Sequence, residues 1–223
     1  MSERLFALPR PESVLYGRDP QALDILIGLH ATATPRILDA TSNTGKMWKG
    51  CSYAPAVRMD IDPTFAPDVV GDFRAMPFEN ESFDLIVFDP PHLPVAAASP
   101  NSSGIWRERY GITSDSGRGR DGDSVSGQFS PFLSEAKRVL CAEGIVLAKL
   151  ADIIHNHRYQ WHLVDFVCAA RSAGLTPCDL LIKRDPSGGS LKSSKWQNVR
   201  HLKRSHSYFV VVRKGRCEKA LAA

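Results

Sequence analysis

The sequence predicts an α/β protein built on a doubly wound, mostly parallel sheet with helices on both faces and an antiparallel last strand. Two observations support this prediction. Short apolar runs alternate with helical patterns along most of the chain, and the last two runs follow each other with no helical pattern between them. The 223 residues are 43% hydrophobic and 23% charged, which excludes a disordered or collagen-like chain. We therefore expect a single domain over residues 1–223.

Seven apolar runs are expected to form the sheet, after one helix at about residues 20–30. Runs that are apolar at nearly every position are typical of strands that are buried on both faces. A second helix is expected to start near Gly45, after a small polar turn that follows the first strand. The expected strands span residues 36–40, 56–60, 68–70, 83–89, 145–150, 178–183 and 207–213.

Two segments interrupt this alternation. Residues 93–127 hold six glycines, seven serines and four arginines, and we interpret them as a mobile loop. Residues 185–206 form a basic loop. The wider segment 183–219 has 11 Lys or Arg against 2 Asp or Glu, so the rest of a chain with net charge +4 sums to −5. This asymmetry favours a surface for a polyanion, although a solvated basic segment would look the same.

No feature of the sequence indicates a membrane or a metal. No apolar run approaches the roughly 20 residues of a spanning helix, and the first residues lack an apolar signal core, so we expect a cytoplasmic protein. The five cysteines have no CxxC spacing and are expected to be reduced thiols. His155 and His157 have no third ligand in view, so no metal site is expected.

Acidic residues end three successive expected strands. Asp39 ends the first, Asp60 follows 21 positions later, and Asp72 follows the third. Ligands of open α/β sheets lie at the carboxyl ends of the strands, where a carboxylate can accept ribose hydroxyls. Each residue alone resembles a helix cap, but together they favour a cofactor that contains adenosine. The small turn at 41–45 would let the backbone approach it.

Two common nucleotide motifs are absent. The chain contains no GxxxxGK[ST] loop, and only Gly45 is present where dinucleotide-binding proteins have a glycine fingerprint. These absences indicate a cofactor without a pyrophosphate.

The second candidate site is Asp89-Pro90-Pro91-His92, at the end of an apolar strand. Two prolines fix the backbone and make a rigid corner. The Asp89 carboxylate and the Pro90 carbonyl are both acceptors, a pair suited to gripping an NH₂ group by its two hydrogens. His92 would present an imidazole on which a planar ring could stack. A simple turn that closes the strand is the alternative interpretation of these prolines.

With these motifs the chain resembles the class I S-adenosylmethionine-dependent methyltransferases, which have a Rossmann-like, seven-stranded fold. More narrowly, it resembles the DPPY/DPPH-type enzymes that methylate adenine N6 or cytosine N4 in DNA. ILDATSNTG at 37–45 matches their cofactor strand, and residues 138–150 and 206–214 resemble their fifth and closing strands. Two departures are DATSNTG in place of a glycine-rich loop and His92 in place of Tyr or Phe.

The resemblance implies a cofactor, S-adenosyl-L-methionine, and a set of residues. The catalytic residues would be Asp89, Pro90, Pro91 and His92. The cofactor-binding residues would be Asp39, Ala40, Thr41, Asn43, Gly45, Asp60, Ile61, Asp72, Phe73 and Asp89. Lys149 is interpreted as a strand-end lysine that points into solvent.

The expected partner is nucleic acid, DNA more than RNA. The candidate nucleic-acid residues are Lys192, Lys195, Trp196, Arg200, Lys203, Arg204, Trp106 and Tyr110. Three hypotheses stand at this point. The first is methyl transfer to an exocyclic amine of a DNA base, and the second is the same chemistry on RNA guanine N2 or a small-molecule amine. The third is a catalytically inactive nucleic-acid-binding module.

Overall fold

The apolar runs and amphipathic stretches form regular elements in the structure, a computed structural model that describes residues 11–92, 125–155, 158–184, 201–202 and 204–216. The strands are β1 (Val14–Tyr16), β2 (Ile37–Asp39), β3 (Val57–Asp60), β4 (Val69–Val70), β5 (Phe83–Phe88), β6 (Leu140–Leu150), β7 (Ile153–His155), β8 (Arg158–Gln160), β9 (Thr176–Arg184) and β10 (His206–Arg213). The α-helices are α1 (Asp19–His30), α3 (Phe129–Val139) and α4 (His162–Ser172), and the 3₁₀ helices are η1 (Lys46–Trp48), η2 (Pro63–Phe65) and η4 (Val125–Gln128).

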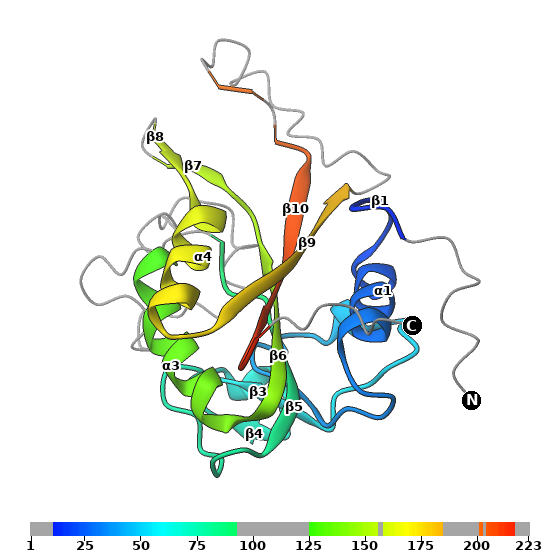
Figure 1. Cartoon of the computed structure of the whole chain (residues 1–223), viewed down its shortest axis with the longest axis vertical. Helices are drawn as coiled ribbons and strands as arrows, with labels where there is room; N and C mark the ends of the chain where they lie inside the picture. Colours follow the sequence, from blue (N-terminus) through cyan, green and yellow to red (C-terminus); the bar gives the residue numbers. More distant parts are fainter. Residues whose placement is uncertain (1–10, 93–124, 156–157, 185–200, 203, 217–223) are drawn as a thin grey trace.

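Eight strands form one sheet in the order β1-β9-β10-β6-β5-β2-β3-β4 (Figure 1). β10 is antiparallel to both of its neighbours, and the pairs from β6 across to β4 are parallel. The predicted Rossmann-like α/β fold is therefore confirmed, and all seven expected strands lie where the sequence placed them. The carboxyl ends of the parallel strands define one rim of the sheet, which we call the carboxyl edge. β10 starts at this edge, because Tyr208 pairs with Leu150 at the end of β6.

Side chains alternate between two buried clusters along the central strands. In β5, Leu85 and Val87 face the cluster under α1, whereas Ile86 and Phe88 face the cluster under α3 and α4. Helices cover both faces of the sheet, so the side chains on both faces of a central strand are buried. The central strands therefore lack the alternation of apolar and polar residues that a half-exposed strand shows. For this reason the sequence shows these strands as apolar runs without a two-residue period.

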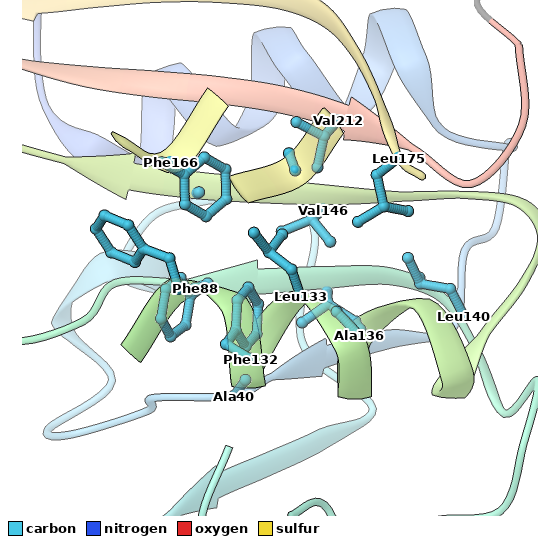
Figure 2. Packing of buried hydrophobic residues seen from close by; sticks show 14 of the residues in the cluster. Ala40, Phe88, Phe132, Leu133, Ala136, Leu140, Val146, Phe166, Leu175 and Val212 are labelled. Atoms are coloured by element: carbon cyan, nitrogen blue, oxygen red, sulfur yellow. The ribbon is translucent and has the colours of Figure 1, made fainter. Parts of the chain in front are cut away.

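Aromatic rings hold α3 against the sheet (Figure 2). Phe88 of β5 and Phe132 of α3 stack with ring centroids 3.6 Å apart, and Phe166 of α4 belongs to the same buried cluster. Ring stacking adds to the burial of two large side chains, so this contact fixes the end of β5 immediately before Asp89.

Three features differ from the expectations. Only the three-residue η1 forms where a helix was expected near Gly45, because Gly45 and Gly50 on either side both have positive φ (69° and 91°). β1 and the β7–β8 hairpin were not expected. Cys178 is disulfide-bonded, which corrects the expectation of reduced thiols throughout.

The length and polarity of a helix decide whether it can cross a membrane. Of the helices in the described ranges, none combines the length and the apolar character that a membrane crossing requires.

The stack between Phe88 and Phe132 gives a test of the packing. Phe132→Ala should lower the free energy of unfolding by about 3–5 kcal/mol, because it leaves a cavity between α3 and the sheet. Leu29→Ala on the exposed side of α1 is the matched control and should cost under about 1 kcal/mol. Urea denaturation of both variants measures the difference, and equal losses would contradict this packing.

Candidate active site

Three acidic residues meet at the carboxyl edge. Asp39 ends β2, Asp60 ends β3 and Asp89 directly follows β5. Their charges are close enough to interact, since Asp60 and Asp89 both raise the pKa of Asp39. The structure thus brings together two of the three predicted cofactor acids and the predicted catalytic acid.

Asp39 is almost completely buried beneath the turn that follows it. Burial chiefly raises its pKa to about 7, although Trp48 Nε1–H donates to its Oδ2 (2.7 Å) and the Thr41 N–H donates to its Oδ1 (3.2 Å). Desolvation disfavours the charged form, and two acidic neighbours act in the same direction. A cationic group placed beside Asp39 would therefore ionise it near neutral pH.

Asp60 shapes the predicted cofactor turn. Its Oδ2 accepts the Asn43 N–H (2.9 Å) and its Oδ1 accepts the Asp62 N–H (2.9 Å). Asn43 has a φ of 44°, in the left-handed region that asparagine tolerates. Asp60 therefore fixes the backbone on both sides of it, the turn at 41–45 and the start of the segment after β3.

Thr41 joins the predicted cofactor turn to the predicted catalytic corner. Its Oγ1 accepts the Asp89 N–H at 2.8 Å. The Ala40 N–H donates to the Val87 carbonyl in the same region. These bonds fix the Asp89 backbone relative to β2, so the two candidate sites are parts of one site.

Asp72 lies farther along the edge, after β4. Its two oxygens accept hydrogen bonds from Arg74, with an ion pair of 2.7 Å, so its charge is compensated. The Phe73 ring beside it packs edge-on against Phe88, with centroids 5.1 Å apart. Ile61 and Phe73 are both half-buried at this part of the edge. A role of Asp72 and its neighbours in holding adenine remains a prediction.

Asp89 belongs to an unbroken series of ion pairs, which we call the ion-pair chain. Its Oδ2 lies 3.1 Å from Lys149 Nζ on β6, and that nitrogen lies 2.9 Å from Asp19 at the start of α1. Asp19 also pairs with Lys183 on β9. On the other side, Asp89 Oδ1 lies 3.3 Å from His92 Nε2. The ion-pair chain therefore runs from β9 to the Asp-Pro-Pro-His corner.

The expectation for Lys149 is wrong. Its side chain is only 16% exposed and is held between two carboxylates instead of pointing into solvent. The reason is its strand: β6 is buried on both faces, so a lysine there must find a partner. Although burial lowers its pKa, Asp89 and Asp19 together raise it above the ordinary value.

The same pairing sets the charge of Asp89. Burial alone would raise its pKa, but Lys149 and His92 bring the pKa down to about 2. Asp89 is thus a carboxylate at any physiological pH, with 28% of its side chain exposed. Such a group accepts hydrogen bonds and does not donate them.

Unpartnered polar atoms collect at this edge. Within the described part of the chain, four buried side-chain N or O atoms lack a hydrogen-bond partner: Ser42 Oγ, His92 Nδ1, Arg204 Nη1 and Ser207 Oγ. Ser42 lies in the turn after β2, His92 after β5, and the other two at the start of β10. Buried polar atoms without partners are rare, so their common location indicates a surface that takes a polar ligand.

Most of the predicted nucleic-acid residues cannot be placed. Lys192, Lys195, Trp196, Arg200, Lys203, Trp106 and Tyr110 lie outside the described residues. Arg204 is described, and its guanidinium lies 5.9 Å from the centroid of the Tyr159 ring. Among the residues the structure describes, no group of three or more His, Cys, Asp or Glu side chains could hold a metal ion.

Sequence reasoning missed several side chains of the site. Asp19 looks like an ordinary acid at a helix start, and Trp48 looks like a core residue. His162 lies at the start of α4. Burial lowers its pKa, and the nearby His92 lowers it further. The available signal was Lys149 itself, because a lysine inside an apolar strand requires a buried counter-ion.

The chain is similar to known proteins in its fold and not in its sequence. No protein-family model matches the chain, and no curated protein matches it. Among solved structures, the cyclase SpnF is 12% identical over 86% of this chain and 80% of that chain, with a TM-score of 0.52.

Two further solved structures score lower. A TehB-like SAM-dependent methyltransferase from Corynebacterium glutamicum is 18% identical over 89% of this chain and 88% of that chain, with a TM-score of 0.47. A candidate DNA modification methylase from Thermus thermophilus is 16% identical over 68% of this chain and 55% of that chain, with a TM-score of 0.43. The match thus spans little more than half of the Thermus protein. At 12% identity, the similarity to the cyclase SpnF shows the fold alone.

The raised pKa of Asp39 predicts a pH-dependent effect of its removal. Protonation of Asp39 favours folding, so its contribution is complete below the ordinary pKa of about 4 and is lost as pH rises through about 7. Asp39→Asn should match the parent near pH 4 and exceed its free energy of unfolding at pH 8 by roughly 1–4 kcal/mol. Urea titrations at both pH values measure this. A variant that is less stable at pH 8 would mean that the ionised form is the favoured one.

Proposed function

We propose that this chain is an S-adenosylmethionine-dependent methyltransferase that transfers a methyl group to an exocyclic amine of a base in DNA. The observation that carries the proposal is the ionised, partly exposed Asp89 carboxylate, fixed beside His92 at the edge where the unpartnered polar atoms collect. An acceptor locked in this way suits an NH₂ group better than it suits a proton transfer.

The residues of the turn fit the proposed cofactor. Ser42 Oγ is buried with no hydrogen-bond partner in the described part of the chain, and the acids Asp39 and Asp60 accept hydrogen bonds from backbone N–H groups of the turn. When bound, S-adenosylmethionine would supply an electrophilic methyl group on a sulfonium. Asp39, the turn at 41–45, Asp60 and Asp72 would hold it. The net positive character of its amine and sulfonium groups would favour the ionised form of Asp39.

Asp89 would act on the amine. The lone pair of an aromatic amine is delocalised into its ring, and a hydrogen bond to Asp89 favours tetrahedral geometry at that nitrogen. The carboxylate would also stabilise the positive charge that develops on nitrogen as the nitrogen–methyl bond forms and the sulfur–methyl bond breaks. The methylated nitrogen, which is then strongly acidic, would lose its extra proton to solvent. Oriented groups of this kind are typically worth on the order of 3 kcal/mol. His92 Nδ1, buried without a partner, would face the bound base through a hydrogen bond or a stacked ring.

Lys149 would keep Asp89 in the required state. It lies behind the carboxylate on Oδ2, whereas His92 lies on Oδ1. A fixed acceptor needs no reorganisation when charge develops, and this preorganisation is the source of most electrostatic stabilisation in active sites. Pro90 and Pro91 restrict the backbone on the other side of Asp89.

The choice of DNA rests on the resemblance and on charge. Residues 183–219 have nine more Lys or Arg than Asp or Glu. RNA guanine N2 and small-molecule amines stay as the alternatives for the same chemistry. An inactive binding module is less favoured, because an inactive protein would have no use for a locked Asp89.

Removal of the Asp89 carboxylate tests the proposal. Asp89→Ala should abolish transfer of labelled methyl groups to DNA while affinity for S-adenosylmethionine changes by less than about twofold. Asp60→Ala is the converse variant and should weaken cofactor binding at least tenfold, about 1.4 kcal/mol. Methyl transfer, mass spectrometry of the digested nucleosides and calorimetry give the two readouts. Methylation by Asp89→Ala at the parent rate would exclude Asp89 from the reaction.

Lys149 gives a second test, through pH. Lys149→Met leaves Asp89 desolvated without its cation, so the pKa of Asp89 should rise. The acidic limb of the methyl-transfer rate should move up by about one pH unit or more. Lys183→Met is the matched control, because Lys183 pairs with Asp19 and not with Asp89. Equal shifts in the two variants would mean that Lys149 acts only through general stability, and Lys149→Arg should restore part of the parent profile.

A further inference from the structure

An aromatic and basic cluster lies beside the candidate site. The β7–β8 hairpin leaves the end of β6, only a few residues after Lys149, and Figure 1 shows it projecting from the end of the sheet where β10 begins. Tyr159 of β8 and Trp161, the residue before α4, have ring centroids 4.5 Å apart. We call Tyr159, Trp161 and Arg204 the aromatic cluster.

A buried acid anchors this cluster. Asp152 is nearly inaccessible, and its Oδ2 accepts the hydroxyls of Tyr159 (3.1 Å) and Tyr208 (3.4 Å). Its Oδ1 accepts the Leu163 N–H, which ties the start of α4 to the hairpin. Because these contacts use both oxygens of Asp152, they hold the Tyr159 ring in one orientation.

The outer side of the cluster is exposed at Trp161. Trp161 is 58% exposed, although a tryptophan in a folded protein is usually largely buried. Arg204 lies over the Tyr159 ring, and its Nη1 is a buried donor without a partner in the described part of the chain. An exposed aromatic ring close to a guanidinium is the composition that binds a nucleobase and its phosphate.

The cluster is connected to the catalytic corner. His162 follows Trp161 directly, and its Nδ1 lies 2.9 Å from the Ala151 carbonyl at the end of β6. His92 is near enough to contribute to the lowered pKa of His162. A strand of nucleic acid whose target base reached Asp89 would therefore have its neighbouring nucleotide close to the hairpin.

We propose that Trp161 and Arg204 bind an unpaired nucleotide of a single strand, next to the target nucleotide. The base would stack on the Trp161 ring, and its phosphate would accept hydrogen bonds from Arg204. This inference rests on the proposed function, because it names how the nucleic acid is held. It also makes single-stranded or locally opened nucleic acid the form of the substrate, since a base within a duplex has no free face for Trp161.

The experiment measures binding without cofactor, so that its outcome is separate from methyl transfer. The probes are a fluorescein-labelled 12-nucleotide DNA of mixed sequence, its RNA counterpart and its DNA duplex. Trp161→Ala should weaken binding of the single strands by about 5- to 150-fold, and Trp161→Phe should retain most of the affinity. Duplex binding should change by less than about threefold. Thermal unfolding midpoints show whether each variant is folded.

Arg204 is tested through salt. Arg204→Gln should reduce the slope of log affinity against log salt on the single strand by about 0.7, the contribution of one phosphate contact. Arg171→Gln, in the last turn of α4, is the matched control and should leave the slope unchanged.

Tyr16→Ala is the control for Trp161. Tyr16 is 67% exposed, an arginine lies over its ring, and it belongs to the edge strand β1, which β9 separates from β10. Equal losses in Tyr16→Ala and Trp161→Ala would overturn the proposal, because exposed aromatics in general would then account for the effect. Equal losses on duplex and single strand would also overturn it. Absence of methylation by the parent, with these binding effects intact, would instead count against the proposed function alone.

Discussion

A lysine near the end of a buried strand cannot stay charged without partners, and this constraint organises the carboxyl edge. Lys149 is flanked by Asp89 and Asp19, and Asp19 is in turn shared with Lys183. Placing an ion in a protein interior costs several kcal/mol, so each member of the ion-pair chain depends on its neighbours. The pairs connect β5, β6, β9 and the start of α1, and the geometry of the edge is therefore set by charge as well as by the apolar packing beneath it.

Two carboxylates at this edge are driven in opposite directions. Burial raises the pKa of Asp39 to about 7, whereas Asp89 is paired with Lys149 and His92 and its pKa falls to about 2. Two acids whose pKa values differ this much can take different roles, and such a difference is typical of active sites. The acid that responds to an incoming cation lies at the predicted cofactor turn. The acid that keeps its charge lies at the Asp-Pro-Pro-His corner.

The sequence predicted the strands because each is buried on both faces and is therefore continuously apolar. It predicted the location of Asp39, Asp60 and Asp89 because carboxyl ends of parallel strands meet at one edge. β1 was missed because three residues with one half-buried side chain carry no pattern. The ion-pair chain was missed for another reason. Its partners are separated by 60, 130 and 164 positions, and no local pattern relates residues that far apart.

The central claim is that Lys149 and His92 hold Asp89 as a carboxylate. The most direct test is a ¹³C NMR titration of the parent protein with labelled aspartate carboxyls, with the Asp89 signal assigned from the spectrum of Asp89→Asn. The account predicts that this signal stays that of an ionised carboxylate down to the acid limit of the folded protein, consistent with a pKa of about 2. A titration of Asp89 at or above about 4, the ordinary value for aspartate, would contradict it.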